Sequence, residues 1–410
     1  MASLVSPTLP LKFSANVRRS SNTRGCSKIR SKVYCTARPV PPSTCSVQFT
    51  GHKTSSSRQL TSVIARVAKP VAAAQAGDGE AQLDPMESAV AKVVGQAAAP
   101  TVVTGLFIAF WYGLNIAFNL ANKSLFNYFP FPWTVSTVHV LVGAVYCGIT
   151  YFLGAKKASY ERPITGDEFK LIFPPAFMHA AGHVAANLSF AAVAISLTHT
   201  VKTLEPVFNV VLSWIFMGTV TPPSVLITLV PIMAGVSYAS AADLSFNWAG
   251  FNGAMISNLT FAFRAVLSKQ NMKNIKNLGS TGIYAWTTLI SCFLCLPGAI
   301  IFEGQALPAG IEAAVAKVGA VTFWSQIFFV GLFYHLYNQF AFNTLGRVSP
   351  VSHGVCNVVK RVAIIVTSVL FFGTPLTLKT KIGTAVALFG TYWYTEAVKA
   401  NNAKKQAKSA

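Results

Sequence analysis

Three basic residues lie within stretches that are otherwise apolar enough to cross a membrane. Lys360 and Arg361 lie near the middle of the stretch 350–373, and Lys202 lies about two turns into 196–218. A Lys or Arg at the centre of a membrane helix costs roughly 2.5–3.5 kcal/mol when it faces lipid. Three such residues would together cost roughly 8–10 kcal/mol, which is comparable to the net stability of a domain. We therefore expect all three to face water, an anion or a counter-charge.

A counter-charge can satisfy only part of this set. Glu205 is the one acid well inside an apolar stretch, three residues after Lys202, so a pair within one helix is available. It could neutralise Lys202 or Lys360, but not all three cations. Snorkelling to the membrane surface remains an alternative for Lys202 and fits Lys360 poorly. The surplus positive charge predicts an anion site, and phosphate fits best because Arg offers a planar fork and Lys a compact charge.

A small organic phosphate would also need neutral hydrogen-bonding partners. A single Tyr or His inside an apolar stretch is more often a packed residue than a ligand. Thr198 and Thr200 are expected to bond backbone carbonyls of their own helix. The candidates for contact with the carbon part are His183, Tyr334, His335 and Tyr337.

The composition predicts a membrane protein. The chain is 52% hydrophobic and 11% charged, whereas a soluble domain carries about a quarter charged residues. Spanning the hydrocarbon requires about 20 apolar residues. The sequence predicts an all-α membrane protein with ten transmembrane helices, near 103–125, 132–154, 168–193, 196–218, 221–240, 247–269, 281–303, 320–345, 350–373 and 377–398.

A weak internal repeat divides this region. Residues 193–238 aligned without gaps on 348–393 give nine identities, among them Gly235 with Gly390. Five spans in each half is an odd number, so consecutive halves insert in opposite orientations. That plan is typical of carriers with a site at the midplane between the halves, although channels also use repeats. The predicted halves are 101–242 and 243–400, and a short basic tail, 401–410, follows them.

The first 77 residues have the composition of a targeting segment. They contain twelve Lys or Arg, twenty Ser or Thr and no acid. This composition predicts a disordered transit peptide and favours a chloroplast, while a retained basic tail is the alternative. The mature chain would start between Val67 and Gly79, and 78–100 would be an exposed lead-in. More than half of the net charge of +21 lies in this removable segment, so nucleic acid is not an expected partner.

Three strings of residues resemble one known family. They are SLTHTVKTLEP at 196–206, FYHLYNQ at 333–339 and NVVKRV at 357–362. Together they are similar to the plastid phosphate translocators, of the drug/metabolite transporter superfamily, over about residues 100–398. The resemblance is strongest to the members that exchange triose phosphate for phosphate.

The resemblance implies ten helices in two inverted five-helix repeats and a location in the chloroplast inner envelope membrane. It implies strict exchange of inorganic phosphate for triose phosphates or 3-phosphoglycerate, with no cofactor and no metal. We expect alternating access in which an anion must occupy the site before it closes. By resemblance, Lys202, Lys360 and Arg361 hold the phosphate, and His183 and Tyr337 contact the carbon part. A gating or secondary role is implied for Arg264, Lys269 and Glu205.

One departure from the family pattern concerns substrate preference. Ala185-Ala186 follow His183-Val184, where triose-phosphate members commonly carry hydroxyl residues. A related translocator for glucose 6-phosphate, xylulose 5-phosphate or phosphoenolpyruvate is therefore an alternative. An anion channel and a nucleotide-sugar carrier of the same fold are further alternatives. An enzyme is not expected, because the sequence has no nucleotide-binding loop, metal-ligand constellation or nucleophile–base pair.

Overall fold

The described part of the chain is built from helices. In this computed structural model the structure describes residues 85–156, 159–271, 275, 278–345, 347–348 and 350–409. These residues all belong to one compact unit, Ser56–Ala410, and they contain no strand. The predicted transit peptide and the start of the lead-in lie outside the described residues.

The helices follow the predicted stretches. They are α2 (Pro85–Val94), α3 (Ala99–Phe126), α4 (Pro132–Phe152), α5 (Gly166–Ala192), α6 (Ile195–Val201), the 3₁₀ turn η2 (Lys202–Leu204), α7 (Glu205–Met217), α8 (Pro223–Leu226), α9 (Leu229–Ala242), α10 (Trp248–Asn271), α11 (Ser280–Glu303), α12 (Leu307–Val318), α13 (Ala320–Leu345), α14 (Pro350–Phe372) and α15 (Leu378–Ser409). Within the described residues, five helices are long and apolar enough to cross a membrane, or six if the bent pair α12–α13 is one span. The all-helical class is confirmed, and the number of ten crossings stays a prediction.

The stretch 196–218 is not the single continuous helix that we predicted. It is divided into α6, η2 and α7, and the break begins at Lys202. The reason is Pro206, which has no N–H to donate to the carbonyl of Lys202 four residues earlier. The amide of Glu205 donates to that carbonyl instead, and this tightens the turn. The break therefore occurs at Lys202, one of the three basic residues that the sequence places inside apolar stretches.

The sequence did not predict α12. This helix precedes α13 and is bent from it by 111°. Gly319 joins the two with a φ of 84°, a conformation that suits glycine. Ala314 is buried in a cluster with Phe129 and Phe323, so α12 packs against the body.

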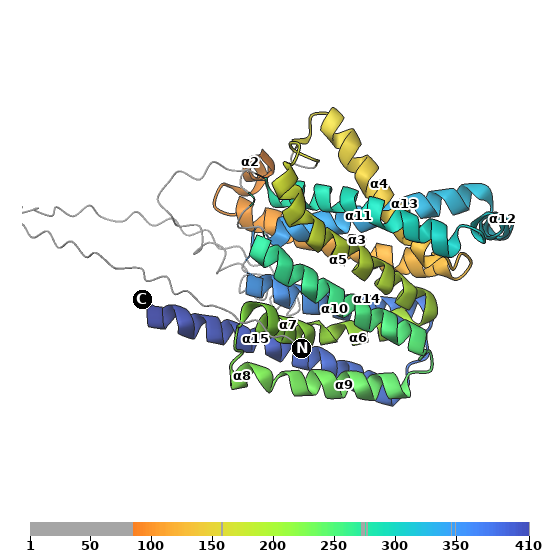
Figure 1. The fold of residues 1–410 in the computed structure, drawn as a ribbon. Helices are drawn as coiled ribbons and strands as arrows, with labels where there is room; N and C mark the ends of the chain where they lie inside the picture. The colour runs from red at the N-terminus through yellow and green to blue at the C-terminus, as the bar shows by residue number, and fades with distance from the viewer. Residues whose placement is uncertain are drawn as a thin grey trace, which may run out of the picture. The chain divides into compact units, whose positions relative to one another are not determined.

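Helices of one predicted half pack against helices of the other (Figure 1). The most extensive contacts join α5 with α10, α9 with α15, and α3 with α13, so each joins one helix from 101–242 with one from 243–400. At the α9–α15 crossing the backbones almost touch. A Cβ on Gly235 would lie 2.5 Å from the amide nitrogen of Ala387, and one on Gly390 would lie 2.9 Å from that of Ile232.

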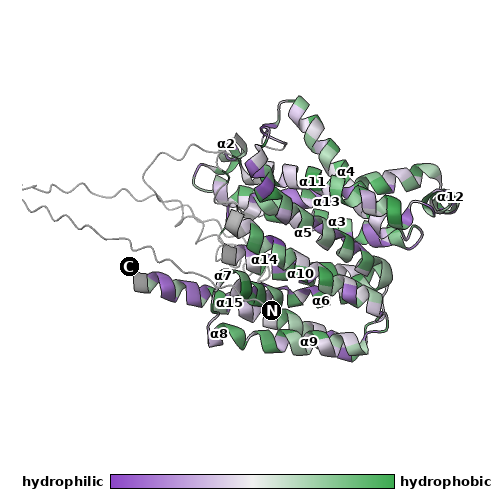
Figure 2. Cartoon of the chain, in the orientation of Figure 1, coloured by the Kyte–Doolittle hydropathy of each residue, from purple (hydrophilic) through white to green (hydrophobic). Residues whose placement is uncertain are grey.

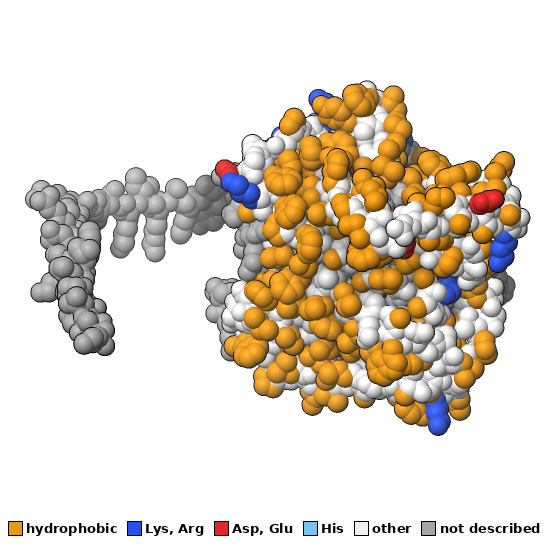
Figure 3. All heavy atoms as spheres, turned by 45° about the vertical axis from the view of Figure 1, so that its right-hand side comes forward, with side chains coloured by type: hydrophobic (Ala, Val, Ile, Leu, Met, Phe, Trp, Pro, Cys, Tyr) orange, Lys and Arg blue, Asp and Glu red, His pale blue; other side chains and the backbone are white. Residues whose placement is uncertain are grey.

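The outer surface of this helical body is apolar. Large hydrophobic side chains are exposed on it, for example Phe152 at 86% and Leu370 at 77%. Figure 2 shows hydrophobic residues along the outward faces of the helices and a hydrophilic end on α15. In Figure 3 one broad face is almost free of charged side chains, which appear toward its edges. A surface of this kind is suited to lipid.

Candidate functional site

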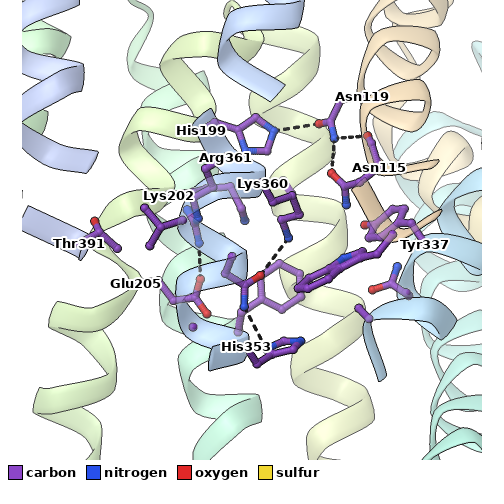
Figure 4. A pocket seen from close by; sticks show the side chains of 18 of the residues that line it. Asn115, Asn119, His199, Lys202, Glu205, Tyr337, His353, Lys360, Arg361 and Thr391 are labelled. Carbon is purple, nitrogen blue, oxygen red and sulfur yellow. Dashed lines mark hydrogen bonds and ion pairs between the residues drawn. The ribbon is translucent and has the colours of Figure 1, made fainter. Parts of the chain in front are cut away.

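One cavity of about 400 Å³ brings most of the predicted site residues together (Figure 4). It lies among α3, α5, α10, α13, α14, α15 and the broken segment α6–η2–α7. Of the eight residues singled out, seven line it: His183, Lys202, Glu205, Arg264, Tyr337, Lys360 and Arg361. The eighth, Lys269, belongs to α10, but its side chain lies outside the described part.

The two lysines have neutral partners. Lys202 Nζ donates to Ser257 Oγ over 2.7 Å and lies 4.7 Å from the centre of the Phe261 ring. Lys360 Nζ donates to Asn357 Oδ1 over 3.1 Å and lies 4.9 Å above the Trp111 ring. Among the described residues neither ammonium forms an ion pair. Both positive charges are therefore available to an anion in the cavity.

The carboxylate that lines the cavity, that of Glu205, pairs with Arg361. Arg361 Nη2 donates to Glu205 Oε2 over 2.6 Å. The sequence spacing had made a Glu205–Lys202 pair available, but the fold gives the carboxylate a partner from the other predicted half. Within the described residues, four cationic side chains and one carboxylate line the cavity. The predicted surplus of positive charge is therefore present in the structure.

His183 and Tyr337 form part of an aromatic wall. His183 is 3% exposed, and its Nε2 lies 3.2 Å from His139 Nδ1 and 3.4 Å from Asn187 Nδ2. Its ring stacks on Tyr334 at 4.1 Å between centroids. Tyr337 lies edge-on to Tyr334, at 5.6 Å. The stacking on Tyr334 and the two contacts of Nε2 hold the buried His183 ring against the wall.

The remaining aromatic candidates differ in position. Tyr334 also lines the cavity, but its hydroxyl lies 3.1 Å from His179 Nε2. His335 does not line the cavity, since it packs against Cys147 and Tyr146 on α4. The packed interpretation therefore applies to His335. Thr198 and Thr200 donate to Ala194 O and Ser196 O, as predicted.

Arg264 lies at the α10 side of the cavity. Its Nη1 lies 2.8 Å from His179 Nδ1, and its guanidinium carbon lies 5.4 Å from the Phe261 ring centre. Lys202 lies over the same ring, so Phe261 contacts two positive charges. This is a position from which Arg264 adds to the positive field of the cavity.

Sequence reasoning missed a polar wall on α3. Trp111, Asn115 and Asn119 are spaced by four and line one side of the cavity. Asn119 Nδ2 donates to Asn115 Oδ1, while Asn119 Oδ1 faces His199 Nε2 at 2.9 Å. The spacing of two asparagines by one turn in an apolar helix was the signal that could have found them. His353, stacked on Trp111 at 4.8 Å, was missed as well.

Ala185 and Ala186, where the sequence departs from the family pattern, are not equivalent in position. Ala186 lines the cavity and is 6% exposed. Ala185 does not line the cavity, and its carbonyl oxygen lies against α10, where a Cβ on Gly253 would be 2.8 Å away. Of the pair, only Ala186 is therefore placed to affect what the cavity accepts.

The cavity lies within the region that matches a family model. The model described as the Triose-phosphate Transporter family matches residues 102–395. This chain belongs to the Triose-phosphate Transporter family. The resemblance predicted from the three motifs is thus confirmed, and the family is one of transporters.

Members of the Triose-phosphate Transporter family from plants are similar to the chain over most of its length. A chloroplastic triose phosphate/phosphate translocator from Flaveria pringlei is 48% identical over 297 residues, which cover 72% of this chain and 71% of the relative. One from Brassica oleracea var. botrytis is 44% identical over 346 residues, or 84% and 82%. A chloroplastic glucose-6-phosphate/phosphate translocator 1 from Arabidopsis thaliana is 38% identical over 313 residues, or 76% and 79%.

Proposed function

We propose that this protein is an antiporter that exchanges inorganic phosphate for triose phosphates and 3-phosphoglycerate across the chloroplast inner envelope. The observation that carries the proposal is the cavity in which Lys202, Lys360 and Arg361 meet from two halves of the chain, with one carboxylate among them. The names of the most similar relatives support the cargo and the chloroplast. The predicted transit peptide is consistent with that location.

The phosphoryl group binds among the three cations in this proposal. The Arg361 guanidinium supplies a fork for two oxygens, and the two ammonium groups supply point charges. The carbon part then faces His183 and Tyr337 on the aromatic wall. Arg264 adds long-range positive charge and does not have to touch the cargo.

Exchange follows from the charge of the empty cavity. Closing a cavity around clustered cations without an anion is unfavourable, because repulsion strengthens as water is excluded. A bound phosphate dianion neutralises part of the charge and permits closure toward either side. The proposed inverted repeat would supply the two equivalent closures. The reciprocal approach of Gly235 to Ala387 and of Gly390 to Ile232, at positions equivalent in the repeat, supports it.

A translocator for a larger phosphate ester is the second candidate. It is favoured by Ala186, which lines the cavity without a hydroxyl group, and by the 38% identity to the glucose-6-phosphate relative. The higher identity to triose-phosphate relatives favours the first candidate.

Reconstitution in liposomes tests the proposal. Uptake of labelled phosphate is expected only into vesicles that contain phosphate, a triose phosphate or 3-phosphoglycerate. Sustained uptake into vesicles without counter-substrate, or an anion conductance, would instead indicate a channel. Competition by triose phosphate, glucose 6-phosphate and phosphoenolpyruvate then separates the two translocator candidates.

A further inference from the structure

The pairing within the cavity is uneven. Lys202 and Lys360 each donate to a neutral oxygen, from Ser257 and Asn357. Of the three, only Arg361 is bound to a carboxylate within the described residues, that of Glu205. A phosphoryl group that binds a guanidinium as a bidentate fork takes two of its nitrogens. Glu205 holds Nη2 of Arg361, so the carboxylate and a phosphoryl group bound to both terminal nitrogens compete for Nη2.

The geometry lets this carboxylate leave its partner. The Glu205 side chain is 34% exposed, whereas that of Arg361 is 12% exposed. Water in the cavity can therefore solvate Glu205 when it is released, which avoids the penalty of an unpaired buried charge. The more buried Arg361 side chain cannot be solvated in the same way, so it needs an anionic partner at all times. A second terminal nitrogen, Nη1, is already buried without a hydrogen-bond partner among the described residues.

We propose, resting on the proposed function, that Glu205 is a built-in competitor of the cargo. It occupies Arg361 while the cavity is empty and yields Arg361 to the phosphoryl group when cargo binds. Glu205 thereby weakens binding of the anion and speeds its release, which an exchanger requires. It is a positioning residue for the transport cycle and not a ligand of the cargo.

The test is phosphate binding to Glu205→Gln. The full chain is purified in detergent, and the Kd for inorganic phosphate is measured by calorimetry. Removal of the competing carboxylate is expected to lower Kd by about tenfold, which corresponds to about 1.4 kcal/mol. In liposomes, KM and kcat for phosphate exchange should both fall, because release becomes slower. A residue that merely supported Arg361 would have the opposite effect, since its loss would raise Kd and KM.

Glu303→Gln is the matched control. Glu303 is also partly buried, but its carboxylate accepts from the amides of Trp133 and Thr134 at the start of α4, away from the cavity. Its substitution should leave the Kd for phosphate unchanged. An unchanged or raised Kd in a folded Glu205→Gln protein would overturn the proposal and leave the proposed function intact.

A second variant, Glu205→Asp, tests the proposal if Glu205→Gln does not fold. Glu205→Asp keeps the charge but shortens the side chain by one methylene, so the 2.6 Å contact with Arg361 is weakened. Its Kd for phosphate should fall several-fold, and a Kd equal to or above that of the wild type would overturn the proposal. If phosphate does not bind to the wild-type protein, both this proposal and the proposed function are wrong.

Discussion

At the scale of single residues, each cation of the cavity has a distinct environment, and this makes their roles separable. Lys360 lies over Trp111 and donates to Asn357, while Arg361 reaches Glu205. Lys360→Ala or Arg361→Ala is expected to abolish phosphate exchange, because either change removes a charge from the proposed phosphate position. Exchange is measured in liposomes against the amount of inserted protein. Lys381→Ala, an exposed lysine near the start of α15, is the control and should exchange normally.

The aromatic wall allows a prediction about the carbon part of the cargo. Tyr337 lines the cavity and packs against Tyr334 and Phe118 through its ring. Tyr337→Phe keeps this packing and removes the hydroxyl group. KM for a triose phosphate should rise several-fold, while KM for inorganic phosphate should change little, since phosphate has no carbon part. Equal changes for both substrates would show that Tyr337 does not distinguish them.

At the scale of elements, the crossing of α9 and α15 depends on glycine. A Cβ at Gly235 would meet the backbone of Ala387 at 2.5 Å and that of Gly383 at 2.6 Å. Gly235→Ala is therefore expected to destabilise the protein by about 1–3 kcal/mol, the usual range for overpacking. The measurement is the thermal unfolding midpoint in detergent.

The control for this crossing is another helical glycine. Gly105 on α3 has no heavy atom within 4 Å of an added Cβ. Gly105→Ala should keep the midpoint or raise it slightly, because alanine favours the helix. If both substitutions lower the midpoint equally, the close approach of α9 and α15 is not the cause.

At the scale of the whole molecule, a second cavity lies at the other end of α3 and α14. Its lining includes Lys123, Ala194 and Ser368, whereas the main cavity is lined by the N-terminal half of α14. Lys123 Nζ donates to the carbonyls of Phe190 and Val193 at the end of α5, at 2.8 and 2.9 Å. These charge-assisted bonds join α3 to the α5–α6 junction, and we expect them to resist separation of the two elements at this end.

Loss of this connection should open the second end more often. Lys123→Met keeps the packing of the aliphatic part of the side chain and removes both hydrogen bonds. The rate at which a polar thiol reagent labels Ser368→Cys should rise about tenfold in the Lys123→Met background, for a shift of about 1.4 kcal/mol. The same background without Ser368→Cys measures reaction of the native cysteines. Lys381→Met is the control background. If Ser368→Cys is labelled no faster with Lys123→Met than with Lys381→Met, the Lys123 hydrogen bonds do not restrict opening at this end.

The sequence by itself determined the membrane environment, the helical class, the family and the choice of candidate site residues. Long apolar stretches dictate helices, because lipid offers the backbone no hydrogen bonds. Basic residues inside them are too costly to face lipid, so Lys202, Lys360 and Arg361 could be selected from position alone. The family followed from three short motifs, and the family model confirmed it. These conclusions depend on local composition, which is visible in one chain.

Only the tertiary structure decided which groups meet. The partner of Glu205 is Arg361, 156 residues away, and not the neighbouring Lys202. The α3 wall with Asn115 and Asn119 became part of the site because α3 packs against α13 and α14, and because Asn119 reaches His199 of α6. The physical reason is that pairing depends on distances of about 3 Å between atoms of different helices. Such distances are set by how the helices cross, which no spacing along the sequence contains.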